Sequence, residues 1–245
     1  MKAIILAAGR GIRLAPLTDQ KPKCMVEYKG KPIIDYTLET LRACGVSDIV
    51  IVKGYRAVAL QRANVRFAVN PNYANTNMVE TLFCVEDELN TDVIVSYGDI
   101  IYESQVLEKL LEYRGDFGVV VDHGWLELWQ SRMENPLADV ESMKINANGQ
   151  IIELGKKPES LAEVQGQYIG LFKISAAVLP IVKDFYHKLD RRKSYDGRAF
   201  EQMYMTSFLQ LIIDDLMPID AIAINRGWLE IDCPKDLECE LRNLS

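Results

Sequence analysis

Histidine is almost absent from this chain. Its 245 residues include only two histidines, His123 and His187, and five cysteines that are scattered without a CxxC pair. A histidine-rich metal cluster, a Ser-His-Asp relay, a thiolate zinc site and a disulfide framework are therefore not expected. Carboxylates, lysines, arginines and backbone amides must carry any chemistry that the chain performs.

Long apolar runs and an excess of positive charge are also missing. Only six apolar residues separate Lys2 from Gly9, too few for a targeting segment or a membrane span. The formal net charge is −7, which repels the phosphates of nucleic acids. We therefore expect a cytoplasmic protein with no membrane or nucleic-acid partner, while a homodimer remains open.

The first half of the chain alternates short β-branched runs with amphipathic segments. Strands are predicted at 3–6, 49–53, 66–69, 93–97 and 118–121, and helices at 33–44, 78–89 and 106–113. This alternation is typical of βαβ units, so we predict an α/β fold with a mostly parallel, mixed sheet flanked by helices.

The rhythm changes after about residue 122. A helix at 125–133 is followed by a hairpin of 141–145 and 150–154, which carries an Asn-Gly turn signal. The remaining predictions are strands at 168–174, 221–224 and 228–231, and helices at 175–189 (with Ser175 as N-cap), 198–215 and 234–244.

A basic, glycine-containing loop follows the first predicted strand. Gly9 and Gly11 suit a turn whose backbone N–H groups face an anion. Arg13 can form a bidentate contact with phosphate oxygens, and Lys23 supplies a point charge. The loop has neither the GxxxxGK[ST] pattern nor the third glycine of a dinucleotide fingerprint. It indicates a polyphosphate site of another kind, with a solvated surface loop as the alternative.

The motifs along the chain resemble those of one enzyme family. The pattern Leu6-Ala7-Ala8-Gly9-x-Gly11-x-Arg13-Leu14-x-Pro16-Leu17-Thr18, followed by Lys21-Pro22-Lys23, resembles the signature of the sugar-phosphate nucleotidyltransferases (nucleoside-diphosphate-sugar pyrophosphorylases). Further family landmarks follow in order at 52–55, 96–99, 153–158, 168–172 and 228–232.

Within this family, the chain is similar to the short bacterial cytidylyltransferases of the phosphocholine type, on segments 72–78 and 228–232. It is more similar to the members that activate L-glutamine phosphate in capsule phosphoramidate assembly, on segments 22–28, 127–129, 135–137 and 203–210.

The resemblance implies a Rossmann-like nucleotidyltransferase fold and a Mg²⁺-dependent transfer of CMP from CTP to a small phosphorylated acceptor, with release of pyrophosphate. The acceptor would be L-glutamine phosphate, or secondly phosphocholine. A phosphate with a second pKa of about 6 is already ionised near neutral pH, so no general base is needed. We expect one domain, 1–245, with a nucleotide-binding half (1–121) and an acceptor-binding half (122–245).

Carboxylates and cations are assigned to the reaction by the same resemblance. Asp99 and Asp232, each after a predicted strand, would bind Mg²⁺, which prefers oxygen ligands. Asp232 also suits the N-cap of the last helix. The catalytic cations would be Arg13, Lys23 and Lys157, with Lys156 as the alternative to Lys157 at the acceptor phosphate.

Two further sets are expected to bind the substrates. The nucleotide would contact Leu6, Ala7, Ala8, Gly9, Arg10, Gly11, Gly54, Thr76, Asn77, Ser96 and Gly98; Thr76 or Asn77 would instead cap the helix at 78. Aromatic faces and carboxylates suit a cationic acceptor, and Arg132 would meet an α-carboxylate. The acceptor set is Trp125, Glu127, Arg132, Lys156, Tyr168, Glu201, Trp228 and Glu230, with Trp129 and Tyr204 nearby; the alternative for its aromatic members is core packing.

Two other functions remain open at this point. A sugar-1-phosphate nucleotidyltransferase that uses UTP or TTP would need several hydroxyl-binding amides in its acceptor pocket. A non-catalytic nucleotide sensor on the same fold would be expected to lack Arg13, Lys23 or Asp99, and all three are present.

Overall fold

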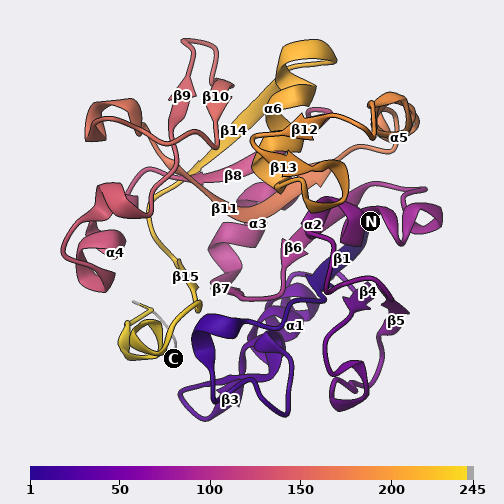
Figure 1. Ribbon diagram of the computed structural model, residues 1–245, viewed down its shortest axis with the longest axis vertical. Helices are drawn as coiled ribbons and strands as arrows, with labels where there is room; N and C mark the ends of the chain where they lie inside the picture. The colour runs from indigo at the N-terminus through magenta and orange to yellow at the C-terminus, as the bar shows by residue number, and fades with distance from the viewer. Residues whose placement is uncertain (242–245) are drawn as a thin grey trace.

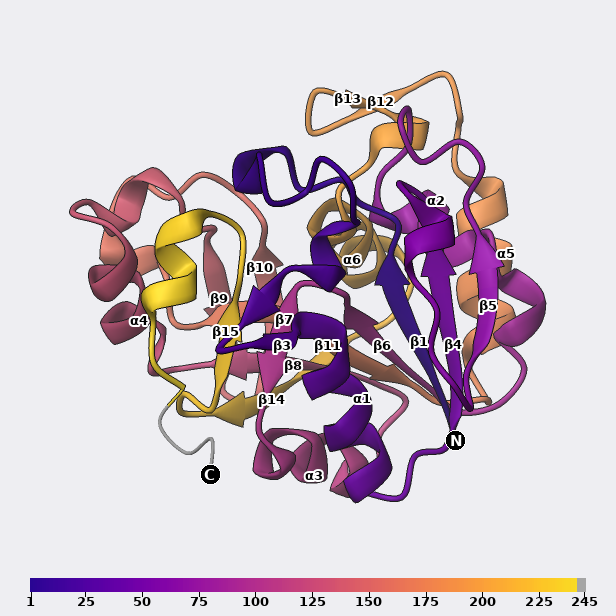
Figure 2. The same ribbon diagram turned by 90° about the horizontal axis from the view of Figure 1, so that it is seen from below.

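A nine-stranded sheet forms the centre of the computed structural model, which describes residues 1–241 (Figures 1 and 2). The strand order is β5-β4-β1-β6-β11-β8-β14-β10-β9. The bounds along the chain are β1 Lys2–Ala7, β4 Asp48–Lys53, β5 Arg66–Val69, β6 Val93–Tyr97, β8 Phe117–Asp122, β9 Met143–Ile145, β10 Gln150–Leu154, β11 Gln167–Ile174 and β14 Ile219–Ile224.

The strands of this sheet point the same way except for β10 and β11. The neighbours β5, β4, β1 and β6 pair in parallel, as do β8 and β14. Strand β11 runs antiparallel between β6 and β8, and β10 runs antiparallel between β14 and β9. The predicted α/β fold with a mostly parallel, mixed sheet is confirmed, and so is the hairpin in the second half.

Helices cover both faces of the sheet because its central strands are apolar on both sides. In β1, Ala3 and Ile5 join one core cluster while Ile4 and Leu6 join the other. This is why β1 reads as a continuous apolar run rather than an alternating one. Helices α1 (Ile33–Ala43), α3 (Ser104–Glu112) and α4 (Trp125–Arg132) pack on the first face, and α2 (Met78–Phe83), α5 (Leu179–Lys188) and α6 (Met205–Asp215) on the second.

Three short strand pairs lie outside the main sheet. Of these, β7 (Ile100–Tyr102) pairs antiparallel with β15 (Trp228–Glu230). The others are β2 (Glu27–Tyr28) with β3 (Lys31–Pro32), and β12 (Ser194–Tyr195) with β13 (Arg198–Ala199). The β7–β15 pair matters for the site, because it brings a segment near the end of the chain against the loop that follows β6.

Two of the predicted helices start later than their sequence pattern indicates. Helix α6 begins at Met205 rather than at residue 198, because Asp196 and Gly197, both with positive φ, turn the chain into the β12–β13 hairpin. Helix α5 begins at Leu179, and the Ser175 hydroxyl donates to Asp116 instead of capping the helix.

Two other predicted helices end early. Helix α2 stops at Phe83 and is followed by a separate 3₁₀ turn at Glu86–Glu88, because Val85 leaves the helical region. The predicted terminal helix is a 3₁₀ helix over Pro234–Glu238; residues 239–241 are not helical, and its last positions lie outside the described residues. No helix within residues 1–241 is long and apolar enough to cross a membrane.

Gly98 is required where β6 meets the end of β1. Its N–H donates to the Leu6 carbonyl at 3.0 Å, and a Cβ on it would lie 2.9 Å from that oxygen and 3.0 Å from Ala7 Cα. Both contacts are backbone atoms of the central strand, so the neighbours of a new methyl group cannot move aside.

We therefore expect Gly98→Ala to lower the free energy of unfolding by about 1–3 kcal/mol, the usual cost of overpacking. Urea denaturation measures this change. Gly9→Ala is the matched control, because no atom lies within 4 Å of a Cβ at Gly9. Equal losses in the two variants would contradict the steric argument.

Candidate active site

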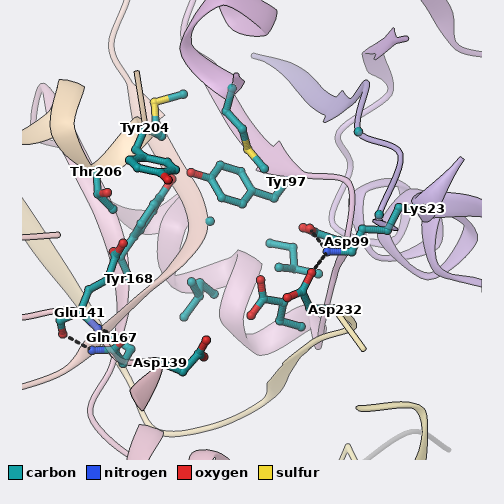
Figure 3. A pocket seen from close by; sticks show the side chains of 18 of the residues that line it. Lys23, Tyr97, Asp99, Asp139, Glu141, Gln167, Tyr168, Tyr204, Thr206 and Asp232 are labelled. Carbon is teal, nitrogen blue, oxygen red and sulfur yellow. Dashed lines mark hydrogen bonds and ion pairs between the residues drawn. The ribbon is translucent and has the colours of Figure 1, made fainter. Parts of the chain in front are cut away.

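Two carboxylates and two cations meet beyond the carboxyl ends of β1 and β6. Figure 3 shows Lys23 with the two carboxylates, Asp99 and Asp232. The Lys23 ammonium donates to Asp99 Oδ2 at 2.6 Å and to Asp232 Oδ1 at 2.6 Å. The Arg13 guanidinium pairs with the other oxygen of Asp232. The Ile231 N–H donates to the Asp99 carbonyl at 2.9 Å, so the β7–β15 ladder fixes the two aspartates relative to each other.

The Lys23 side chain is positioned by the glycine loop. Gly11 adopts a left-handed conformation (φ 69°), and a Cβ at this position would lie 2.8 Å from Lys23 Cγ. Burial tends to lower the pKa of Lys23, but the charges of Asp99, Glu230 and Asp232 outweigh it and raise that pKa. Lys23 is therefore a permanent cation at the centre of an acidic cluster.

Glu230 lies on β15, two residues before Asp232. Burial and the negative charge of Asp99 raise its pKa to about 7, although Lys23 and Arg132 act in the opposite direction. Its side chain keeps 30% of its surface exposed and lines the cavity described below. Glu230 thus adds a third carboxyl group, with a raised pKa, beside the Lys23 cluster.

A buried ion pair holds the loop that carries Asp232. Asp236 Oδ2 accepts from the backbone N–H groups of Asp232 and Cys233, each at 2.8 Å. Arg132 Nε donates to Asp236 Oδ1 at 2.8 Å, and both side chains are at least 95% buried. Burial tends to raise the pKa of Asp236, but Arg132 and the two N–H donors lower it. Arg132 therefore braces the Asp232 loop, and it is not among the residues that line the cavity.

A cavity of about 440 Å³ opens beside the Lys23 cluster. The structure brings ten of the predicted site residues to its wall. They are Gly9, Gly11, Arg13, Lys23, Asn77, Asp99, Tyr168, Trp228, Glu230 and Asp232, and Trp129 and Tyr204 join them.

The cavity wall also contains residues that the sequence analysis missed. The polar ones are Tyr97, Asp139, Glu141, Gln167 and Thr206. Asp139 and Glu141 belong to an irregular segment between α4 and β9. Glu141 was predicted to begin the strand at 141–145, but that strand begins at Met143. Tyr97 ends a predicted strand, and Gln167 immediately precedes the strand predicted at 168–174, which begins at residue 167 in the structure. The sequence did not show that these two strands, β6 and β11, are neighbours in the sheet.

A smaller pocket of about 90 Å³ adjoins the cavity and shares Gly9, Asn77 and Met78 with it. Its other lining residues are Leu6, Ala8, Tyr73, Thr76 and Thr81. The Asn77 side chain accepts from the Met78 N–H at 2.8 Å and so caps α2. A narrow, largely apolar slot next to the glycine loop suits a flat ring.

Five residues of the predicted nucleotide set line neither pocket. They are Ala7, Arg10, Gly54, Ser96 and Gly98. A Cβ at Gly54 would lie 2.6 Å from Tyr73 Cβ and 2.7 Å from the Ala8 carbonyl, so Gly54 allows the two loops to meet. Arg10 lies over the Tyr55 ring and 3.8 Å from Asp19.

The remaining acceptor and phosphate assignments lie away from the cavity. Trp125 is in the core, and the Glu201 carbonyl accepts from the Asn77 N–H. Glu127 lies 4.0 Å from Arg226. Lys156 pairs with Glu153, and the Lys157 ammonium donates to the carbonyls of Leu137 and Ala138 at 2.7 and 2.9 Å. Since none of these side chains lines the cavity, we assign them no contact with a ligand there.

Comparison with known proteins gives the class to which this site belongs. Residues 3–148 match the family model of the MobA-like NTP transferase domain. The chain belongs to this family of nucleotidyltransferases, as the sequence motifs predict.

Similar proteins and a similar solved structure indicate the type of nucleotidyltransferase. The chain is 46% identical to the CTP:phosphoglutamine cytidylyltransferase of Campylobacter jejuni, over 98% of this chain and 99% of the relative. It is 36% identical to the choline-phosphate cytidylyltransferase of Streptococcus pneumoniae, over 45% of this chain and 50% of that protein. A solved structure of CTP:phosphocholine cytidylyltransferase from the same species has a TM-score of 0.72 at 22% identity, covering 97% of this chain and 96% of that one. The predicted enzyme class, a nucleotidyltransferase of the cytidylyltransferase type, is confirmed.

The Arg132–Asp236 pair generates a stability prediction. We expect Arg132→Ala to lower the free energy of unfolding by about 3 kcal/mol or more, because it leaves the buried Asp236 carboxylate without its cation. The control is Arg192→Ala, which removes an ion pair with Asp190 whose arginine is 90% exposed. That change should cost less than about 1 kcal/mol.

Thermal and urea unfolding of the two variants measure the difference. A small loss in Arg132→Ala, similar to that in Arg192→Ala, would show that Arg132 does not brace the Asp232 loop.

Proposed function

We propose that this protein is a Mg²⁺-dependent cytidylyltransferase that transfers CMP from CTP to L-glutamine phosphate and releases pyrophosphate. The observation that carries the proposal is the continuity of one cavity. It runs from a cationic glycine loop, suited to a triphosphate, to an acidic and aromatic wall, suited to a small zwitterion. The 46% identity over nearly the whole chain to a CTP:phosphoglutamine cytidylyltransferase supports the choice of acceptor. Phosphocholine is the second candidate.

The reaction needs positioning and charge neutralisation more than proton transfer. An ionised phosphate oxygen of the acceptor attacks the α-phosphorus of CTP, and the bond from that phosphorus to the bridging oxygen of pyrophosphate breaks. Arg13 and Lys23 stabilise the negative charge that crowds on the phosphates, while Gly9 and Gly11 let the backbone approach them. The acceptor phosphate is its own nucleophile, which agrees with the scarcity of histidine.

The residues present fit a Mg²⁺ ion that is completed by substrate. Asp99 Oδ1 is buried and has no hydrogen-bond partner among the described residues. Asp232 offers a second carboxylate on the other side of Lys23. Within residues 1–241 there is no group of three or more histidine, cysteine or acidic residues placed to hold a metal on its own. One or two carboxylates together with substrate phosphates are the usual Mg²⁺ ligands, and the ion would neutralise charge on the triphosphate.

The narrow slot beside the glycine loop is where we place the cytosine ring. Its walls are Leu6, Ala8 and the loop that leads into α2. Gly54 keeps the Ala8 backbone and Tyr73 in contact, so the slot is held in shape from behind. Backbone groups there can read the exocyclic amine and the carbonyl of cytosine.

The substrate pair is tested by measuring pyrophosphate release with Mg²⁺. CTP, UTP, TTP and ATP are each combined with L-glutamine phosphate, phosphocholine and glucose 1-phosphate. We expect kcat/KM to be highest for CTP with L-glutamine phosphate by about tenfold or more, equivalent to about 1.4 kcal/mol of transition-state binding. A preference for phosphocholine, or for UTP or TTP with a sugar phosphate, would overturn the proposal.

The metal assignment is tested by Asp99→Asn. We expect kcat to fall by about 100-fold or more, because the loss of a metal ligand removes several kcal/mol of charge stabilisation. EDTA should silence the wild-type enzyme for the same reason. Asp184→Asn, on the exposed face of α5, is the control and should keep full activity. Near-normal turnover by a folded Asp99→Asn variant would rule out the metal role.

A further inference from the structure

The wall of the cavity that faces away from Lys23 is acidic. Figure 3 shows Asp139, Glu141 and Gln167 on the opposite side from Lys23, Asp99 and Asp232. Asp139 accepts one hydrogen bond, from Trp129 Nε1 at 3.1 Å. In the part of the chain that the structure describes, neither Asp139 nor Glu141 forms an ion pair. This wall therefore presents two carboxylates to the cavity. Arg132 interacts electrostatically with Asp139, whereas no cation among the described residues pairs with Glu141.

Glu141 is held in place through its backbone. The buried Gln167 side chain donates from Nε2 to the Glu141 carbonyl at 2.7 Å and accepts from the Glu141 N–H through Oε1 at 3.4 Å. The next residue, Ser142, donates its N–H to the Lys156 carbonyl at 2.7 Å. The backbone is thus fixed on both sides, while the Glu141 side chain itself remains exposed. A fixed backbone below an accessible carboxylate is the arrangement of a preorganised binding group.

The electrostatics of this wall favour a cation. The protein atoms packed around Glu141 raise the pKa of its carboxyl group, and the negative charge of Asp139 raises it further. Two carboxylates that repel each other at the wall of a cavity are both stabilised when a positive charge enters between them.

The hydrogen-bonding groups distinguish one kind of cation from another. The Tyr168 hydroxyl is buried on the same side of the cavity, where it interacts with the Tyr97 hydroxyl. A primary ammonium carries three N–H donors, which the oxygens of Glu141, Asp139 and Tyr168 can accept. A quaternary ammonium carries none, although the aromatic ring of Tyr97 would attract either cation.

We propose that Glu141, positioned by Gln167, selects acceptors that carry a primary ammonium at the end opposite their phosphate. This inference rests on the proposed function in one respect: it takes the phosphate end of the acceptor to lie beside Lys23 and Asp99. It assigns Glu141 as a specificity-determining residue and Gln167 as a positioning residue.

The test measures affinity, so that it does not depend on turnover. L-glutamine phosphate and its analogue without the α-amino group are titrated by calorimetry into the enzyme, with Mg²⁺ and α,β-methylene-CTP present to prevent transfer of CMP. We expect the wild-type enzyme to bind the amino compound at least about tenfold more tightly, the range for hydrogen bonds to a charged group. Glu141→Gln keeps the shape of the side chain and should abolish this ratio.

The control variant is Glu159→Gln, which changes an exposed carboxylate away from the cavity and should keep the wild-type ratio. An unchanged ratio in Glu141→Gln, or no preference in the wild-type enzyme, would overturn the inference. Failure of the proposed function is seen separately, as an absence of pyrophosphate release from CTP and L-glutamine phosphate. In that case a Glu141-dependent preference for the amino compound would still support the inference.

Discussion

The Lys23 ammonium between Asp99 and Asp232 is the interaction on which the rest of the site depends. Two carboxylates this close would repel each other, and one buried cation at 2.6 Å from each makes their approach favourable. Three other residues make this contact possible. Gly11 leaves room for the Lys23 side chain, and Gly98 allows β6 to approach the end of β1. Asp236 holds the Asp232 loop through its backbone N–H groups. The arrangement places fixed charge where a polyphosphate needs it before any substrate arrives.

Local sequence pattern predicted the sheet well and the helix boundaries less well. Strand β6 is buried and has an apolar run, and it was located to the residue. The edge strand β5 was also located to the residue, although it is only partly buried. The helix prediction at 198–215 was wrong over its first seven residues, because the Asp196-Gly197 turn and the β12–β13 pairing override helical spacing. Strand β7 was missed because three residues carry no period, and its partner lies far along the chain.

In the site, too, residues of a local motif were predicted and residues placed by distant contacts were not. The residues near Lys23 were predictable because they belong to a long motif whose chemistry is local, a glycine turn followed by cations. Arg132 was predicted to meet a substrate carboxylate, yet it pairs with Asp236, and only the packing of α4 against the last 3₁₀ helix reveals that contact. Asp139 carried no signal, since its segment is irregular. Glu141 was predicted as the first residue of a strand, but β9 begins at Met143, and the Glu141 backbone is held by Gln167 from a distant strand.

The β7–β15 ladder also constrains the order in which the molecule can assemble. Ile100 pairs with Glu230, and most of the second half of the chain lies between them. Contacts this distant in sequence form slowly, because a large loop must close before the pairing stabilises it. During synthesis on a ribosome, Lys23 and Asp99 emerge long before β15. The Asp99 carboxylate is therefore present before Asp232 has been synthesised. The chemical centre of this protein is therefore completed only after β15 has been synthesised.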